Sequence, residues 1–283
     1  MADEVERTIL GNIISARRRA LDETCWAIPL ERVQHAAEAR EERRDFAAAV
    51  ASGAALSAQA RVRVIAELKR ASPSRGLLRQ QYRRREIALG YAAAGAAALS
   101  VLTEQQYFLG SVPDLAEARG AVELPVLRKD FILESYQVYE SVAAGADALL
   151  LIVAVLPDGD LRSMIELCQR LRIDALVEVH TEPELDRALA AGARMIGVNN
   201  RNLKTLEVSL DTSFQLRAKI PPGCITVSES GIKTTADLRR LAEAGFDAVL
   251  IGERLMTEPD PGQALRELLA GFEGPAIRET RAD

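Results

Sequence analysis

The sequence predicts a single (β/α)8 barrel of the TIM type, preceded by a helical N-terminal extension. Eight apolar, strand-like runs alternate with helical segments, and near-continuous apolar strands linked by helices are typical of a parallel barrel. An open, doubly wound sheet is the alternative, and the regular count of eight argues against it. The eight runs are Val62–Lys69, Ala97–Thr103, Pro125–Lys129, Ala148–Val153, Ala175–Val179, Met195–Asn199, Ile225–Ser228 and Ala248–Ile251.

A repeated phrase marks four of the junctions between helix and strand. In each repeat an alanine precedes a glycine, at Gly95, Gly145, Gly192 and Gly245, and a strand-like run follows directly. Glycine is favoured just beyond the end of a helix because the chain there adopts a left-handed conformation. The glycines are 50, 47 and 53 residues apart, so each interval holds two βα units of ordinary length.

The first 60 residues differ from the rest and are predicted to form the helical extension. Val5–Leu21 has apolar residues at helical spacing and ends in three arginines, Arg17 to Arg19, expected to be a solvated cationic end. Leu30–Val50 predicts a second helix, and Trp26 between the two is expected to pack in the core. The domains are then 1–60 for the extension, 61–272 for the barrel and 273–283 for a C-terminal tail.

Composition limits the class of protein. The net charge of −5 argues against a nucleic-acid binder, and no apolar run is long enough for a membrane span. The acidic N-terminus lacks the apolar core of a signal peptide. Three scattered cysteines, Cys25, Cys168 and Cys224, are expected to be reduced thiols of a cytoplasmic protein. With only His35 and His180, a His-rich metal site is excluded.

In such a barrel, functional residues lie at the C-terminal ends of the strands. Glu67 and Lys69 end the first run, and because they are two residues apart they share one face of the strand. Charge in a buried sheet is costly unless it is paired or used. A turn-rich loop, Ser72–Gly76, follows. These features favour a functional site, with an internal ion pair that closes the barrel end as the alternative.

Further polar residues end later runs: Lys129 the third, Glu178 the fifth, and Asn199, with Arg201 close behind, the sixth. Converging lysines and glutamates shift one another's pKa values and can supply an ammonium acid and a carboxylate base near neutral pH. Glu178, between two valines, is the best candidate base, and a simple ion pair with a lysine is its alternative. His180 is expected to be a supporting residue rather than a catalyst.

Two loops predict a phosphate site, because glycine lets backbone N–H groups approach an anion closely. They carry Ser230-Gly231 after the seventh run and Gly252-Glu253 after the eighth, where barrels commonly bind phosphate. Helix capping is the alternative. The scarce aromatic residues Tyr107, Phe108 and Phe131 lie in two other loops, which favours a flat substrate group. Alternatively, these aromatic residues pack against one another in a lid over the barrel, and the composition favours neither explanation.

Seven stretches taken together resemble the indole-3-glycerol phosphate synthase family of tryptophan biosynthesis. They are Glu67–Ser74, Leu99–Glu104, Tyr107-Phe108, Leu127–Phe131, Gly197–Leu203, Ser228–Ile232 and Leu250–Glu253. The resemblance implies ring closure of 1-(2-carboxyphenylamino)-1-deoxyribulose 5-phosphate with loss of CO2 and water, without metal or organic cofactor. It implies a small phosphosugar-anthranilate substrate, no nucleic acid and no membrane, with association with other tryptophan-pathway enzymes left open.

The resemblance also implies roles for individual residues. Lys129 matches the general acid and Glu178 the base, while Lys69 would bind phosphate or act as a second acid. Glu67 and Asn199 would orient hydroxyl groups and the lysines, and Arg201 would orient Glu178 or bind the substrate carboxylate. The substrate-binding set is Ser72, Leu102, Phe108, Phe131, Leu150, Arg201, Ser230, Gly231, Gly252 and Glu253.

Two departures from the family pattern stand out. Arg79–Arg85 is basic where the family often has an acidic segment, and Ile132–Ser135 replaces a common Asp-Pro. Two other functions stay open at this point: a different phosphosugar isomerase on the same barrel, and a catalytically retired barrel kept as a scaffold. The intact Lys129, Glu178 and Glu67 argue against the scaffold, since a scaffold has no need of costly buried charge.

Overall fold

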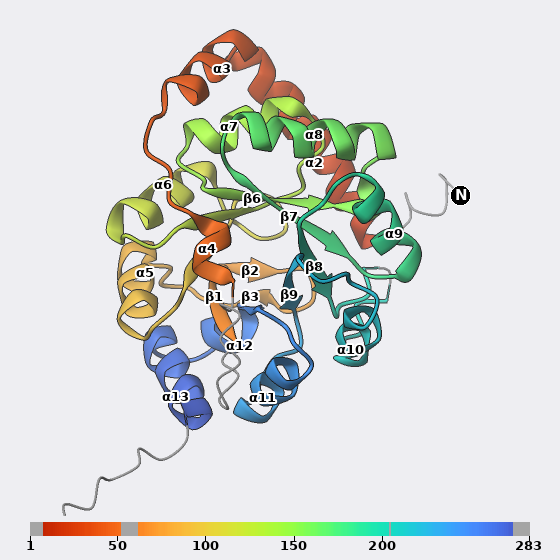
Figure 1. The fold of residues 1–283 in the computed structure, drawn as a ribbon. Helices are drawn as coiled ribbons and strands as arrows, with labels where there is room; N and C mark the ends of the chain where they lie inside the picture. The colour runs from red at the N-terminus through yellow and green to blue at the C-terminus, as the bar shows by residue number, and fades with distance from the viewer. Residues whose placement is uncertain (1–7, 52–61, 204, 274–283) are drawn as a thin grey trace, which may run out of the picture.

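The computed structural model describes residues 8–51, 62–203 and 205–273, and its main feature is a closed barrel of parallel strands (Figure 1). Neighbouring strands follow the order β1-β10-β9-β8-β7-β6-β5-β4. A short antiparallel ribbon of β2 (Ala71–Ser72) and β3 (Gly76–Leu77) lies in the loop after β1. The barrel strands are β1 (Arg63–Leu68), β4 (Ala98–Leu102), β5 (Val126–Lys129), β6 (Ala148–Ile152), β7 (Asp174–Val179), β8 (Met195–Asn199), β9 (Ile225–Glu229) and β10 (Ala248–Ile251).

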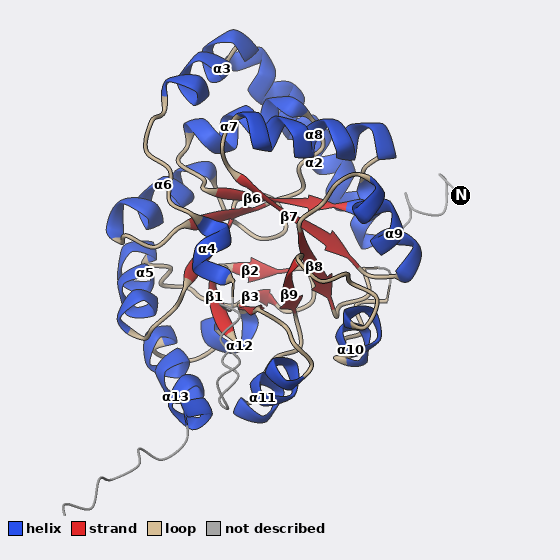
Figure 2. Ribbon diagram, viewed as in Figure 1, coloured by secondary structure: helices blue, strands red, loops and turns tan. Residues whose placement is uncertain are grey.

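Helices follow the strands and cover the outside of the barrel (Figure 2). They are α5 (Arg84–Ala93), α6 (Val112–Ala121), α7 (Ser135–Ala143), the 3-10 turn η1 (Val153–Val155), α8 (Asp158–Arg170), α9 (Glu182–Ala190), α10 (Asp211–Arg217), α11 (Thr235–Glu243), α12 (Glu253–Met256) and α13 (Pro261–Glu273). Of the described helices, none combines the length and the hydropathy that crossing a bilayer requires.

The predicted strands are confirmed, and each observed end lies within one residue of the predicted end. The glycines of the repeated phrase also have the expected conformation, with φ of 94° at Gly95, 102° at Gly145, 89° at Gly192 and 84° at Gly245. Alternation along the strands then sorts the apolar side chains into two groups. One group fills the barrel interior, and the other packs the sheet against its helices.

The N-terminal extension contributes to both ends of the barrel. It consists of α2 (Ile9–Ala27), α3 (Leu30–Ala39) and α4 (Phe46–Val50). Phe46 and Val50 of α4 are fully buried against the interior core, and the Ala47 N–H donates to the Asp174 carboxylate at the start of β7 (2.9 Å). Helix α2 packs its apolar face on the same interior core from the opposite end, while α3 lies on α7 (Figure 1).

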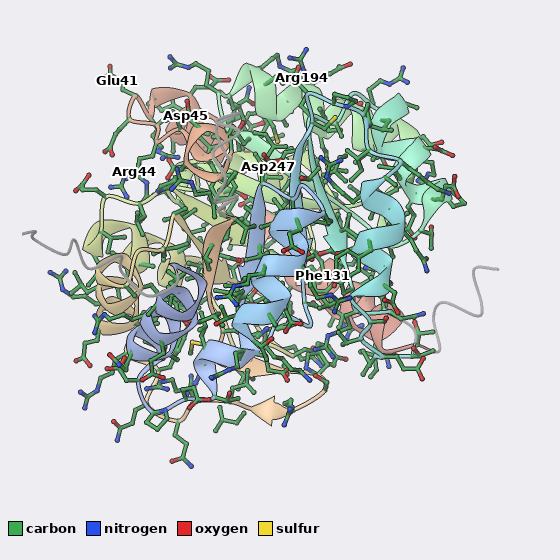
Figure 3. All side chains as sticks on the ribbon, turned by 60° about the horizontal axis from the view of Figure 1, so that its bottom comes forward. Glu41, Arg44, Asp45, Phe131, Arg194 and Asp247 are labelled. Carbon is green, nitrogen blue, oxygen red and sulfur yellow. The ribbon has the colours of Figure 1, made fainter. Side chains whose placement is uncertain are left out.

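The predicted helix over Leu30–Val50 is wrong in its continuity, because the chain leaves the helical path between α3 and α4. Arginine side chains of this segment bind the barrel instead. Figure 3 shows where Arg44 of this segment lies. Arg40 pairs with Asp147 (2.6 Å), and Arg44 donates to the carbonyl oxygens of Val122 (2.7 Å) and Leu124 (2.9 Å). In all, five backbone carbonyls and one buried carboxylate of the barrel accept hydrogen bonds from Arg40 and Arg44.

Two predictions about α2 are also wrong. The helix continues to Ala27, so Arg17 lies in its middle, and the Arg17 side chain is buried in an ion pair with Asp130 (3.0 Å) rather than solvated. Trp26 is 90% exposed and does not pack in the core. An amphipathic pattern shows which face of a helix is apolar, but it does not show which polar residue finds a partner 113 positions away.

Candidate functional site

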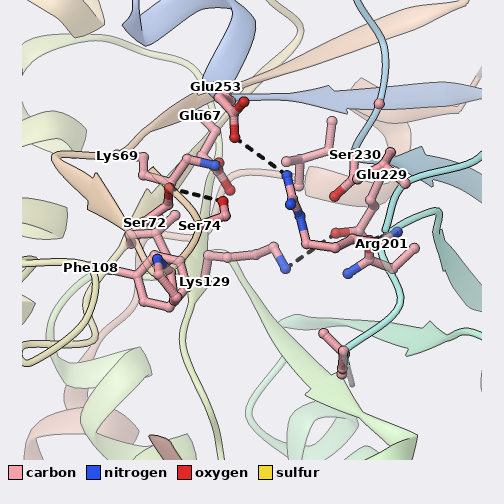
Figure 4. A pocket seen from close by; sticks show the side chains of 18 of the residues that line it. Glu67, Lys69, Ser72, Ser74, Phe108, Lys129, Arg201, Glu229, Ser230 and Glu253 are labelled. Atoms are coloured by element: carbon pink, nitrogen blue, oxygen red, sulfur yellow. Dashed lines mark hydrogen bonds and ion pairs between the residues drawn. The ribbon is translucent and has the colours of Figure 1, made fainter. Parts of the chain in front are cut away.

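A cavity of about 540 Å³ opens at the C-terminal ends of the barrel strands (Figure 4). The structure brings every residue of the proposed catalytic and substrate-binding sets into its lining, although their individual roles stay predictions. From the catalytic set these are Glu67, Lys69, Lys129, Glu178 and Asn199; from the binding set, Ser72, Leu102, Phe108, Phe131, Leu150, Arg201, Ser230, Gly231, Gly252 and Glu253. Tyr107, from the same aromatic group, does not line it.

The floor of the cavity is a ring of charged side chains, which we call the charged layer: Glu67, Lys129, Glu178 and Glu229. These residues come from β1, β5, β7 and β9, which are alternate strands around the barrel. Side chains from alternate strands of such a barrel point inward at the same height. Two residues earlier, the same strands place Ile65, Leu127, Leu176 and Val227 in the interior core. The charged layer therefore rests on an apolar one.

Lys129 joins the members of the charged layer. Its Nζ atom lies 2.9 Å from Oε2 of Glu178 and 3.3 Å from Oε2 of Glu229. On the other side of the layer, Glu67 forms its own pair with Lys69, with 2.6 Å between Oε2 and Nζ. The expectation that Glu67 and Lys69 share one face is confirmed by this contact. These two lysines and three carboxylates all line the same cavity.

Burial and pairing give these groups different affinities for protons. Burial raises the pKa of Glu229 to about 7, opposed by the charge of Lys129 and assisted by that of Glu178. Burial also acts to raise the pKa of Glu178, but Lys129 and His180 together lower it below its ordinary value. Burial disfavours the Lys129 ammonium, yet Glu178 and Glu229 bring the pKa of Lys129 above its usual range. The site therefore contains a charged lysine, an ionised carboxylate and a carboxyl group that titrates near neutrality.

The proton on Glu229 predicts a pH dependence of stability. Because burial places the pKa of Glu229 at about 7, above the ordinary glutamate value of 4.5, the folded protein keeps a proton there that the unfolded chain has released. The stabilisation that this proton gives the folded state is fully present below pH 4.5 and is lost as the pH rises through 7. Urea unfolding of the wild type and of Glu229→Gln from pH 4.5 to 8 measures it as a steeper decline of the free energy of unfolding in the wild type than in the variant. Parallel curves for the two proteins would refute this assignment.

Two glycines leave room for the carboxylates of the charged layer. A Cβ atom at Gly252 would lie 2.0 Å from Oε2 of Glu67 and 3.0 Å from Nζ of Lys69. A Cβ atom at Gly197 of β8 would lie 2.2 Å from Oε1 of Glu229. Real Cβ contacts are not this short, so any larger residue at either position has to displace a charged group of the site.

One wall of the cavity is apolar. The Phe108 and Phe131 rings lie 6.3 Å apart between centroids, tilted by 42°; Leu150 packs in the same apolar cluster, and Leu102 also lines the cavity. Glu104 holds the loop that carries Phe108, since its carboxylate accepts hydrogen bonds from the N–H groups of residues 106, 107 and 108. Ile9, Leu10 and Ile13 of α2 extend this wall from the N-terminal extension.

Two arginines lie against Glu253 in the lining of the cavity, and Figure 4 shows one of them, Arg201. The Glu253 carboxylate accepts from Arg75 (3.1 Å) in the loop after β1 and from Arg201 (3.4 Å) in the loop after β8. Arg79, from the basic segment that departs from the family pattern, donates to the carbonyl oxygens of Glu258 and Pro259 just after α12 (both 2.7 Å). The loop after β1 is therefore fastened to the last βα unit at two points.

The loop after β9 has a backbone suited to an anion. Ser230 (φ 67°) and Gly231 (φ 81°) are both left-handed, which lets successive N–H groups of a turn form a concave surface. The Asn200 amide fixes this loop by donating to the carbonyl oxygens of Glu229 (2.9 Å) and Ser230 (3.1 Å). Lys233 lines the same end of the cavity.

Sequence reasoning missed several lining residues. Glu229 has the same inward position on β9 that Glu178 has on β7, so the alternation of strand residues could have identified it. No comparable signal exists for Ile9, Leu10, Ile13 or Arg75, because the folded chain alone places the extension and the loop over the cavity. Within residues 8–51, 62–203 and 205–273, no three His, Cys, Asp or Glu side chains gather so as to hold a metal ion.

Comparisons with known proteins give a consistent picture. The family model for indole-3-glycerol phosphate synthase matches residues 10–268. An enzyme of that name from Albidiferax ferrireducens is 47% identical over 262 residues, which cover 93% of this chain and 98% of the relative. One from Carboxydothermus hydrogenoformans is 50% identical over 215 residues, covering 76% of this chain and 81% of that protein.

Similar solved structures share the fold at low sequence identity. Thiamine phosphate pyrophosphorylase from Pyrococcus furiosus superposes with a TM-score of 0.56 at 16% identity, covering 75% of this chain and 95% of that one. A mandelate oxidase variant gives a TM-score of 0.57 at 20% identity, covering 74% of this chain and 72% of that chain. These likenesses concern the barrel alone.

Proposed function

Because this chain belongs to the indole-3-glycerol phosphate synthase family, we propose that Lys129 and Glu178 carry out the acid–base chemistry of its reaction. The protein is a carboxy-lyase of tryptophan biosynthesis, which closes the ring of 1-(2-carboxyphenylamino)-1-deoxyribulose 5-phosphate with loss of CO2 and water. One observation carries the proposed roles: a 2.9 Å contact between ammonium and carboxylate, in a cavity of about 540 Å³. A cavity of that size suits a small-molecule substrate.

Lys129 serves the first step. A carbon–carbon bond forms between the ring carbon that bears the carboxylate and the ketone carbon, and Lys129 donates a proton to the ketone oxygen. Loss of CO2 from the same ring carbon returns the bonding electrons to the ring. The charge that Glu178 and Glu229 maintain on Lys129 supports this role, because only the ammonium form can donate.

Glu178 serves the second step. Loss of water forms the remaining double bond of the indole, so the methylene carbon next to nitrogen must give up a proton and the hydroxyl group must receive one. Glu178 accepts the former, and Lys69 or Lys129 supplies the latter. Its lowered pKa keeps Glu178 ionised and ready to accept a proton at neutral pH. Asn199 hydrogen-bonds to Glu178 and, together with Glu67, orients the reacting groups.

The rest of the cavity suits the two ends of the substrate. The phosphate lies in the loops of Ser230-Gly231 and Gly252-Glu253, where backbone N–H groups and the Lys69 ammonium are available. The anthranilate ring packs on Phe108 and Phe131, and Arg201 reaches its carboxylate. Ser72 belongs to the loop that covers the bound substrate.

Replacing Gly252 by alanine is expected to lower kcat/KM at least about tenfold, because the new Cβ atom forces the Glu67 carboxylate away from Lys69. Gly159→Ala is the matched control, since the same change on α8 meets no atom within 4 Å. Steady-state kinetics of both variants, with thermal unfolding as a check on folding, gives the comparison. Equal activity of the two variants would show that the space at Gly252 is irrelevant.

Turnover of the proposed substrate by the purified protein tests the function directly. The appearance of indole fluorescence and the release of one CO2 per product are expected. A well-folded protein that leaves this substrate unchanged but converts phosphoribosylanthranilate would instead be an isomerase. We also place the enzyme in the cytoplasm, with other tryptophan-pathway enzymes as possible partners, on the strength of its bacterial biosynthetic relatives.

A further inference from the structure

His180 lies outside the cavity lining but directly behind Glu178. It is the first residue after β7, and its ring is held between two carboxylates. Nδ1 lies 3.0 Å from Oε2 of Glu184 on α9, and Nε2 lies 3.4 Å from Oε1 of Glu178. We propose that His180 is a positioning residue which, as an imidazolium at neutral pH fixed by Glu184, holds Glu178 in place and in its ionised form.

The geometry requires both ring protons. A neutral imidazole has one N–H donor and one lone pair, so one of its nitrogens would direct a lone pair at a carboxylate oxygen. This holds for either neutral tautomer, because in this ring orientation each nitrogen faces a carboxylate. The Glu178 side chain is about 1% exposed and that of His180 about 10%, so solvent relieves little of that repulsion. Only the doubly protonated ring pairs favourably on both sides.

Glu184 is well placed to fix the ring. Its Oε2 accepts a hydrogen bond from the backbone N–H of His180 (2.7 Å) as well as from the ring. Its own N–H donates to Oγ1 of Thr181, the N-cap of α9. The carboxylate is thus part of the start of the helix, and the imidazolium stands on a rigid support. Burial of the ring disfavours its charged form, but Glu184 on α9, Glu178 on β7 and Glu229 on β9 outweigh burial and raise the pKa of His180 above its ordinary value.

The proposal explains how Glu178 can stay ionised through the reaction, and it rests on the proposed role of Glu178 as the base. Oε2 of Glu178 pairs with Lys129, while Oε1 faces His180. When Lys129 gives its proton to the ketone oxygen, Glu178 loses its nearest cation. His180 then remains as the second positive charge, which keeps Glu178 available as a proton acceptor for the loss of water.

The charge of His180 can be measured without any activity assay. The sequence has two histidines, so imidazole NMR signals of the labelled protein are assigned by a single His35→Gln variant, whose site is exposed on α3. His180 is expected to keep both ring protons at pH 7 and to titrate above the ordinary histidine pKa of about 6.5. Glu184→Gln is expected to lower that titration point by about one pH unit. A neutral His180 ring at pH 7 would overturn the proposal.

The kinetic test is the pH profile of kcat/KM. His180→Asn keeps a donor but removes the charge, so the acidic limb is expected to move upward by about one pH unit and kcat to fall about tenfold, with little change in KM. His35→Gln leaves the profile in place. An unmoved acidic limb in an active His180→Asn enzyme would overturn the proposal, whereas a wild type that forms no product would refute the proposed function instead. If His180→Asn does not fold, Glu184→Gln provides the same test.

Discussion

Lys129→Met is expected to lower kcat by about 10²- to 10⁴-fold while leaving binding of the product largely unchanged, because the variant lacks the proposed proton donor but keeps the loops that bind phosphate. Methionine fills much of the lysine volume, so the packing beneath it is retained. Single-turnover formation of indole fluorescence measures the chemical step, and calorimetry with indole-3-glycerol phosphate measures binding. Near-normal turnover would remove Lys129 from the acid role.

Lys129→Met is also expected to change the protonation of the two carboxylates that Lys129 contacts. Without Lys129, the two buried carboxylates Glu178 and Glu229 face each other without the cation that joins them. Glu229, with its pKa already raised to about 7 by burial, is expected to take up the compensating proton. Lys219→Met, a change at a half-exposed surface lysine, is the control for the loss of one positive charge and should retain full activity.

Glu178→Gln is expected to reduce kcat by a similar factor of about 10² to 10⁴, since the amide has nearly the same shape but cannot accept the proton. The two variants should differ in which step fails. Loss of Lys129 blocks ring closure, so CO2 is not released, whereas loss of Glu178 allows CO2 release and stops the reaction before the loss of water. Labelled CO2 counted against indole fluorescence separates the steps. Equal loss of both signals in Glu178→Gln would assign Glu178 to the first step.

The sequence predicts those features of the molecule that depend on residues close together in the chain. It predicts poorly those that depend on residues far apart in the chain. The barrel is predictable because each βα unit repeats the same local pattern, down to glycines such as Gly145 that end a helix with φ above 90°. Glu178 stands out because it lies between two valines, whereas Glu229 lies between Ser228 and Ser230 and differs less from its neighbours in polarity. Its partner Lys129 is 100 positions away, and such a pairing becomes visible only when alternate strands meet at one height.

The extension illustrates the opposite case. Its helices follow from periodicity, yet Phe46 reaches one end of the barrel and Leu10 the other. Nothing local to Arg17 distinguishes it from Arg18 and Arg19, although it alone of the three is buried. The difference arises because α2 turns one side toward Asp130, and the docking of a helix on a barrel depends on both surfaces together.

The charged layer has a consequence for the evolution of this enzyme. Beneath it, the equivalent positions are filled by Ile65, Leu127, Leu176 and Val227, the ordinary solution for a barrel interior. Replacing buried ion pairs by apolar side chains of similar volume is often neutral or stabilising. The four charged positions are therefore where selection for robustness and selection for turnover oppose each other most directly. A lineage released from the need for catalysis would be expected to lose this layer first and to become a more stable protein.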